Sequence, residues 1–310
     1  MSSSADAVVF DRVVKRYGSV TAVDGLSLSI RSGEMFGLIG PDGAGKTTTI
    51  RLLCGLLASD GGHINVLGLD PVKQHRDVTR AVGYLSQRFS LYADLSINEN
   101  IAFFAEIHGM RGYEPARDRL LAMTQLAPFG NRLAGQLSGG MKQKLALACT
   151  LIHEPRLIVL DEPTTGVDPV SRREFWKLLS EFLSQGITIV MATPYLDEAE
   201  RCSRVALLHK GQLLALDQPD ALRATLPGSM FEVIGANHRG VVSALRRFPG
   251  AANVQLFGER AHIRLAEARP DAEPAIAAFM RNAGVEVSSI RQVSASLEDV
   301  FVTRLGDMAS

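Results

Sequence analysis

The sequence contains few cysteines and no closely spaced pair of them. Only three of its 310 residues are cysteine, Cys54, Cys149 and Cys202, and no C-x-x-C motif occurs. This spacing indicates neither a zinc site nor a framework of disulfides. Cys54 and Cys149 fall in apolar helical patterns, so we expect buried thiols in a reducing compartment.

Long apolar runs are also missing, and we expect no signal peptide in the first residues. No stretch approaches the roughly 20 apolar residues that a membrane-spanning helix needs. The N-terminus, Met1 to Asp6, has neither a basic start nor an apolar core, which argues against a signal peptide. If the protein acts at a membrane, we expect another chain to provide the spans.

Neither sign of charge is in excess. The 33 basic and 33 acidic residues cancel, so nothing in the balance favours nucleic acid as the main partner. With 46% hydrophobic and 21% charged residues, the composition is typical of a soluble globular protein. The length suits one large domain or two of ordinary size.

What the sequence does contain is a phosphate-binding loop pattern, G-x-x-x-x-G-K-[ST]. The apolar run Met35–Ile39 leads into it, and a helical pattern follows up to Leu57. Glycine N–H groups and a helix N-terminus can surround phosphate oxygens, while Lys46 adds a charge and Thr47 offers a hydroxyl to Mg²⁺. The pattern predicts a site for a nucleoside triphosphate with Mg²⁺, in which the binding residues are Gly40, Pro41, Asp42, Gly43, Ala44, Gly45, Lys46, Thr47 and Thr48.

Two carboxylates close a second apolar strand, Leu157–Leu160. A carboxylate at a strand tip can hold Mg²⁺ through water, and we assign this role to Asp161. Glu162 could polarise the attacking water as a general base, a role typically worth ~10²–10⁴ in rate. The alternative for Glu162 is a helix-capping or surface carboxylate.

A third segment, Leu137-Ser138-Gly139-Gly140-Met141, is a glycine-rich turn that opens a helix. In this order, the three segments resemble the ATP-binding cassette of ABC-type ATPases, and the resemblance extends over residues 7–217. It implies that the N–H groups of Ser138, Gly139 and Gly140 bind the γ-phosphate held by another cassette. Two cassettes then close head-to-tail around two ATP molecules, so this chain is expected to form a homodimer or to pair with a related cassette.

Other positions match further motifs of the family. Tyr17 resembles the aromatic residue that stacks on adenine, and Gln87 resembles the glutamine that reaches Mg²⁺ and the attacking water. Gly166-Val167-Asp168 resembles the loop that crosses to the partner cassette. The resemblance implies that Glu162, Lys46 and Gln87 are catalytic, and that Thr47, Gln87 and Asp161 hold the metal ion.

One position departs from the family. Where the family has a histidine that contacts the γ-phosphate, directly after Thr193, this chain has Pro194, which lacks an N–H donor. Two alternatives stay open: the site still turns over with another switch group, or the chain is a slow regulatory cassette that needs a partner. A smaller departure is Asp42, where asparagine is common, and its negative charge is expected to lower phosphate affinity.

The expected fold is α/β. The resemblance implies a cassette with a mostly parallel core sheet, an antiparallel β-subdomain and a helical subdomain. Two prolines and a glycine between Asp217 and Ser229 indicate a boundary, which gives domains at residues 1–220 and 221–310. From Met230 to Ile290 the order β-α-β-β-α-β predicts a small α+β ferredoxin-like domain, and a last helix follows Ser296 as N-cap.

Two short segments resemble parts of membrane exporters. Ser90–Asn100 resembles the segment that receives a coupling helix of a transmembrane subunit, with Leu91, Tyr92 and Leu95 as an apolar groove; ordinary packing is the alternative. Residues 296–301 resemble the end of single-cassette subunits of drug, antibiotic and lipid exporters. In those subunits a small C-terminal domain aids dimerisation or assembly.

The sequence therefore predicts an ATPase subunit of an ABC exporter. It would lie peripherally on the cytoplasmic face of the cell membrane and bind separate permease chains. A soluble ABC ATPase of translation or DNA repair is the alternative. Such proteins usually carry two cassettes, long coiled-coil inserts or zinc modules, and the sequence shows none of these.

Overall fold

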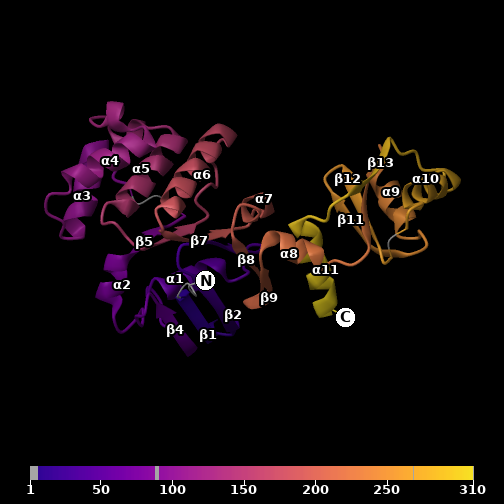
Figure 1. The fold of residues 1–310 in the computed structure, drawn as a ribbon, viewed down its shortest axis with the longest axis horizontal. Helices are drawn as coiled ribbons and strands as arrows, with labels where there is room; N and C mark the ends of the chain where they lie inside the picture. Colours follow the sequence, from indigo (N-terminus) through magenta and orange to yellow (C-terminus); the bar gives the residue numbers. More distant parts are fainter. Residues whose placement is uncertain (1–5, 88–90, 268, 310) are drawn as a thin grey trace. The chain divides into compact units, whose positions relative to one another are not determined.

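The computed structural model describes residues 6–87, 91–267 and 269–309. The chain divides into two units, Met1–Leu216 and Asp217–Ser310, whose elements are coloured along the sequence in Figure 1. Ser90, the first residue of the segment expected to receive a coupling helix, lies outside the described residues, as do Met1 to Ala5 of the N-terminus.

A six-stranded sheet of order β5-β6-β7-β3-β8-β9 forms the centre of the first unit. The pairs β5–β6, β6–β7, β7–β3 and β3–β8 are parallel, which confirms the mostly parallel core sheet. Because β3, β6 and β7 are buried along their whole length, they read in the sequence as unbroken apolar runs. The strands are β3 (Met35–Ile39), β5 (Val82–Leu85), β6 (Leu157–Asp161), β7 (Thr188–Thr193), β8 (Arg204–His209) and β9 (Gln212–Asp217).

An antiparallel sheet covers part of this core. It has the order β2-β1-β4 and consists of β1 (Asp6–Tyr17), β2 (Val20–Arg31) and β4 (Gly61–Val66). In β2, Leu26, Leu28 and Ile30 are buried and Ser27 is exposed, the alternation of a strand with one face on the core. Helix α1 (Lys46–Leu53) contacts β2 and β4 of this sheet and also β6 and β7 of the central sheet. The helix therefore joins the two sheets into one core.

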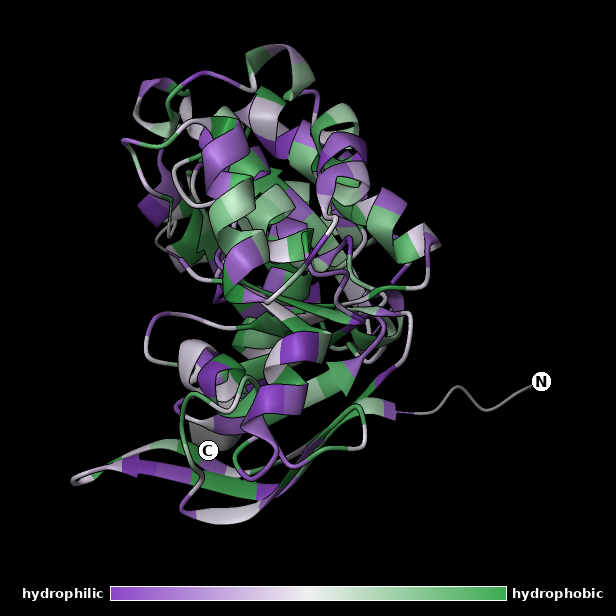
Figure 2. Cartoon of the chain, turned by 90° about the vertical axis from the view of Figure 1, so that its left-hand side faces the viewer, coloured by the Kyte–Doolittle hydropathy of each residue, from purple (hydrophilic) through white to green (hydrophobic). Residues whose placement is uncertain are grey.

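Helices α3 to α6 lie on the side of β5 and β7 away from the antiparallel sheet (Figure 1), as expected for a helical subdomain. Figure 2 shows the hydrophilic and hydrophobic faces of the helices as purple and green bands. Helix α3 begins with a capping box in which Ser96 and Glu99 bond each other's backbone. The helices of this unit, besides α1, are α2 (His75–Ala81), α3 (Ile97–Ile107), α4 (Glu114–Thr124), α5 (Gly139–Leu151), α6 (Pro169–Ser184) and α7 (Leu196–Ala199), with 3₁₀ turns at η1 (Ala127–Phe129) and η2 (Ala134–Gln136).

The second unit has the ferredoxin-like arrangement. Its antiparallel sheet has the order β11-β12-β10-β13, and helices α9 and α10 follow the first and third of its strands along the chain. Alternate residues such as Phe231 and Ile263 form a buried cluster with Leu245 and Ile276 of these helices. The elements are α8 (Pro219–Ala224), β10 (Ser229–Ile234), α9 (His238–Leu245), β11 (Ala251–Phe257), β12 (Arg260–Leu265), α10 (Ala272–Asn282), β13 (Ser289–Val293) and α11 (Leu297–Ala309).

Helix α11 belongs to the other face of this sheet. His262, which alternates with the core residue Ile263, has its Nδ1 atom 3.1 Å from Asp299 Oδ1. Asp299 N donates to Ser296 Oγ, and Ser296 N donates to Asp299 Oδ2. Ser296 is therefore the N-cap of α11, as the sequence predicts.

The start of the last strand, β13, differs from the sequence prediction. The pattern Val285–Ile290 predicts a strand, but β13 begins only at Ser289. The preceding segment is irregular, because Gly284 N and Val285 N donate to the last carbonyls of α10, those of Arg281 and Met280. Val285 and Val287 still pack against the core. Their spacing of two residues is therefore the same as in a strand with one buried face, although the segment is irregular.

All three cysteines are buried thiols, which confirms the expectation for Cys54 and Cys149. Burial raises the pKa of Cys54 to about 12, and nearby Asp161 adds to the shift. Burial likewise raises the pKa of Cys202 to about 12, with a contribution from Glu198, and raises that of Cys149. At neutral pH these thiols are therefore protonated and chemically inert.

Candidate active site

The phosphate loop joins the end of β3 to the start of α1. Its residues Gly43 and Gly45 have φ values of +77° and +100°, which side chains resist. Space also demands glycine: a Cβ atom on Gly40 would lie 2.3 Å from Leu208 O, and one on Gly45 would lie 2.4 Å from Ala22 O. The loop is thus fixed by its packing against β8 and β2.

Lys46, the first residue of α1, has a buried side chain inside this loop. Its Nζ atom donates to Gly40 O at 2.8 Å and to Pro41 O at 3.1 Å. The same atom lies 3.8 Å from Glu162 Oε1. The ammonium group is therefore placed between the loop that would hold phosphate and the carboxylate that would activate water.

Thr47 and Asp161 meet although 114 positions separate them. Thr47 Oγ1 donates to Asp161 Oδ1 at 3.1 Å. Burial raises the pKa of Asp161, the hydrogen bond from Thr47 opposes this shift, and the charge of Glu162 adds to it. A hydroxyl and a carboxylate are oxygen ligands of the kind that Mg²⁺ prefers together with waters and substrate phosphates, so this pair fits the predicted metal ion.

Glu162 has an unusual backbone for a residue with a side chain. Its φ is +50°, in the left-handed region that such residues seldom occupy. Its N–H donates to Ala192 O at 2.9 Å, which ties the end of β6 to β7. Its Oε2 atom accepts a 2.9 Å hydrogen bond from Gln87 Nε2, so two of the three predicted catalytic side chains are in direct contact.

These residues surround one cavity of about 760 Å³. Tyr17, Lys46, Thr47, Gln87 and Glu162 all line it, together with Asp42 to Gly45 and Thr48. Tyr17 is 46% exposed and lines the cavity, so a planar base in the cavity could contact its ring. Gly40, Pro41 and Asp161 do not line the cavity but support residues that do.

Four further lining residues were missed by the sequence analysis: Val20, Thr21, Ala22 and Lys210. They reach the cavity from the start of β2 and from the turn between β8 and β9. The sequence offers one signal for this turn, the glycine that follows Lys210. A Cβ atom on Gly211 would lie 2.9 Å from Ala22 O, so this glycine lets the turn pack against the start of β2. Lys210 brings a second positive charge to the same cavity as Asp42.

The predicted signature residues stand apart from this cavity, at the N-terminus of α5. Ser138 caps the helix, and its Oγ atom accepts from Met141 N at 3.3 Å. A Cβ atom on Gly140 would lie 2.2 Å from Ser171 Oγ, whereas one on Gly139 would meet open space. Gly139 thus leaves its backbone accessible, while Gly140 packs against α6. Asp168 caps α6 by accepting from Val170 N and Ser171 N.

Pro194 follows β7 directly beside the phosphate loop. The residue before it, Thr193, pairs with Ile39 at the end of β3. Thr193 Oγ1 donates to Glu198 Oε2 at 2.7 Å, and Tyr195 N donates to Thr193 Oγ1. Pro194 therefore lies just after the carboxyl end of β7, next to the end of the strand that leads into the phosphate loop.

The described part of the chain contains neither a complete set of metal-binding side chains nor a membrane-spanning helix. No group of three or more His, Cys, Asp or Glu side chains there could hold a metal ion by itself. Phosphate oxygens and water would have to complete the ligands of Mg²⁺. No helix among the same residues is long and apolar enough to cross a bilayer.

Comparison with known proteins places the chain in a family. Residues 23–165 match the family model described as ABC transporter. The chain is 41% identical over 311 residues to the probable multidrug ABC transporter ATP-binding protein YbhF of Escherichia coli (strain K12), which covers 97% of this chain and 52% of the relative. The chain thus spans about half the length of that relative.

Two other relatives match over nearly their full length. The Nod factor export ATP-binding protein I of Paraburkholderia xenovorans (strain LB400) is 36% identical and covers 97% of both chains. The daunorubicin resistance ATP-binding protein DrrA2 of Streptomyces coeruleorubidus is 35% identical, with 97% of this chain and 95% of the relative covered.

Solved structures agree with this assignment. An ATP-binding subunit of an ABC transporter superposes with a TM-score of 0.65 at 28% identity, covering 70% of this chain and 92% of the other. The dimeric structure of a bacterial ABC transporter cassette gives a TM-score of 0.61 at 26% identity, covering 68% and 98%. The chain belongs to the ATP-binding proteins of the ABC transporter family.

Proposed function

We propose that this chain is the subunit that binds and hydrolyses ATP for an ABC exporter. One observation carries the proposal: Lys46, Thr47, Gln87 and Glu162, from three strand ends far apart in the sequence, line a single cavity. The carboxyl ends of parallel strands are where ligands bind in α/β proteins. The chemistry gathered there is that of phosphoryl transfer to water.

The protein residues would divide the work as follows. Lys46 and the loop N–H groups would hold the triphosphate, and Thr47 with Asp161 would hold Mg²⁺, which neutralises developing charge on the phosphates. Glu162 would take the proton of the attacking water, and Gln87, bonded to it at 2.9 Å, would orient both. Tyr17 would stack on the base.

The remaining site residues support a paired assembly. Ser138, Gly139 and Gly140 form a helix N-terminus outside the cavity, and Gly139 leaves open space before it. Such a terminus binds anions, so we propose that it meets the γ-phosphate held by a second cassette. A similar cassette has been solved as a dimer. The partner would be a second copy or a related chain.

We propose that permease chains dock next to α3, and that the protein lies on the cytoplasmic face of the membrane. Leu91 and Leu95 are half-buried there, and Tyr92 is 45% exposed. Buried Asn100 holds this loop by donating to the carbonyls of Tyr92 and Leu95. The relatives' names mention multidrug, Nod factor export and daunorubicin resistance, so the cargo would be drugs, antibiotics or lipid-like compounds.

The second domain would serve assembly rather than catalysis. The proposed domains at residues 1–220 and 221–310 differ by four residues from the two units of the structure, which divide at Leu216 and leave α8 whole in the second unit. The cavity that carries the proposal is lined only by residues between Tyr17 and Lys210. This leaves the ferredoxin-like unit free for dimerisation or for contact with the permease.

Substituting Lys46 tests the proposed function. Lys46→Ala should raise the apparent Kd for Mg-ATP at least about tenfold and abolish phosphate release, because a buried ammonium beside the phosphates would be lost. Fluorescent-nucleotide binding and a phosphate assay measure both. Lys177→Ala, an exposed lysine on α6, should behave like the wild type. Equal binding by both variants would contradict the assignment.

Pro194→His tests the alternative of a slow regulatory cassette. An imidazole at this position would supply the donor that proline lacks, so we expect kcat for ATP to rise several-fold. The neighbouring change Tyr195→His adds an imidazole outside the proposed switch position and should not raise it. An unchanged or lower kcat for Pro194→His would mean that the position is adapted to proline.

A further inference from the structure

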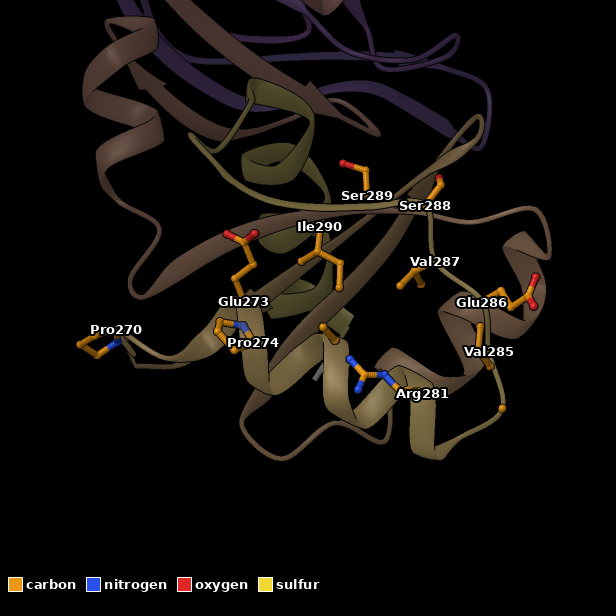
Figure 3. Close-up of a pocket in the computed structure, with 12 residues that line it drawn as sticks. Pro270, Glu273, Pro274, Arg281, Val285, Glu286, Val287, Ser288, Ser289 and Ile290 are labelled. Atoms are coloured by element: carbon orange, nitrogen blue, oxygen red, sulfur yellow. The ribbon is translucent and has the colours of Figure 1, made fainter.

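One hollow of the second unit lies between α10 and the segment that ends in β13. It has a volume of about 990 Å³. Figure 3 shows Glu273, Pro274 and Arg281 on the helix side and Ser289 and Ile290 on the strand side. We call this hollow the α10–β13 groove, and its lining residues also include Ala277 and residues 284–288.

The strand side of the groove is an open sheet edge. Among the described residues, β13 pairs only with β10, because it ends the order β11-β12-β10-β13. The opposite edge strand, β11, carries a register shift between Ala251 and Asn253, a bulge that discourages further pairing. No such irregularity interrupts the pairing of β13. The only charged residue of β13 is Arg291, and its Nε atom forms a salt bridge with Glu232 Oε1 at 2.7 Å.

The helix side presents a stripe of opposite charges. Ala272, Ile276 and Met280 form the buried face of α10. One position further along, Glu273, Ala277 and Arg281 follow the same i, i+4, i+8 spacing and line the groove. The two charged residues are exposed and Ala277 is half-buried. Eight positions place the charges about 12 Å apart along the helix, too far to pair with each other.

This stripe is complementary to itself. If two α10 helices meet antiparallel with Ala277 near the twofold axis, Glu273 of each copy faces Arg281 of the other. The small side chain at the centre lets the helices approach closely, and each isologous contact occurs twice. A partner of uniform charge would meet repulsion at one end of the stripe.

We infer that a second copy of this chain occupies the α10–β13 groove, with the two α10 helices antiparallel and the β13 edges beside each other. The contact lies entirely in the second unit and needs no nucleotide. It would hold two chains together when the ATP-dependent cassette contact is open. It deepens the proposed assembly role of this domain and rests on that part of the proposed function.

Charge reversal tests this contact in the full-length chain without nucleotide and with EDTA. Glu273→Arg and Arg281→Glu should each raise the dimer Kd about tenfold, because two attractive pairs become two repulsive ones. The double variant restores opposite charges and should return the Kd to within about threefold of the wild type. Sedimentation equilibrium measures the Kd, and 1 M NaCl should weaken the wild-type dimer.

Glu259→Arg is the matched control, because Glu259 is exposed in the turn between β11 and β12 and should leave the Kd unchanged. ATP binding, measured separately, should be the same in all variants, so failure of this inference is separable from failure of the nucleotide site. A wild-type chain that stays monomeric at about 100 μM overturns the inference, since weak specific pairs would still associate there. Single reversals without effect, or a double variant without rescue, also overturn it.

Discussion

Replacing Glu162 by glutamine is expected to lower kcat for ATP hydrolysis by about 10²–10⁴-fold. The amide keeps the shape of the side chain and can still accept from Gln87, which bonds Oε2 at 2.9 Å. It cannot take a proton from water. Because the loop, Lys46 and Thr47 are untouched, ATP should still bind, and the variant should accumulate as an ATP-bound pair of about twice the mass.

Asp42→Asn is the matched control for this variant, since it also removes one carboxylate from the lining of the same cavity. It should lower KM for ATP, because a negative charge near phosphates is lost, and it should not lower kcat. Stopped-flow phosphate release and light scattering measure turnover and mass. Turnover by Glu162→Gln within about threefold of wild type would place the general base elsewhere.

Removing the carboxylate of Glu198 is expected to destabilise the first unit by about 3 kcal/mol. Glu198 is 1% exposed and accepts hydrogen bonds from the hydroxyls of Thr193 and Thr164. Arg172 Nε lies 3.9 Å from its Oε1 atom. Glu198→Ala would leave the buried hydroxyls of Thr164 and Thr193 without this acceptor, would remove a carboxylate next to half-buried Arg172, and would open a void.

The chain has one tryptophan, so tryptophan fluorescence measures the stability of the unit that contains it. Trp176 lies in α6 and is 5% exposed, so its fluorescence reports unfolding of the first unit in urea. Glu198→Gln, which keeps one acceptor oxygen, should lose less stability than Glu198→Ala. Glu181→Ala, an exposed residue of the same helix as Trp176, should change stability by less than about 0.5 kcal/mol. Equal midpoints for all variants would contradict the argument.

Much of the cassette could be predicted because its signals are local. The phosphate loop needs three glycines between an apolar strand and a helix. In the structure each of them is required by a close approach of another atom or by a positive φ. The strands β3, β6 and β7 are buried throughout, so they appear as plain apolar runs. The order of elements in the second unit was also readable, since each of its strands and helices has its own short pattern.

What could not be predicted depends on contacts between distant segments. Lys210 and Ala22 line the nucleotide cavity only because a hairpin and the antiparallel sheet meet there. The start of β13 was misplaced, because Val285 and Val287 pack from an irregular segment with the spacing of a strand. Glu273 and Arg281 on α10 indicate a contact surface only when it is known that the neighbouring strand β13 lies at the edge of its sheet in the described structure.

The three inert thiols give the protein a practical property. Burial keeps Cys54, Cys149 and Cys202 protonated and out of contact with solvent, so maleimides should label the folded chain very slowly. A cysteine introduced at any exposed position would then be the sole reactive one, with no need to remove the native residues. One cysteine introduced into each unit would carry a spin label or fluorophore, and the distance between the two labels could be followed during turnover.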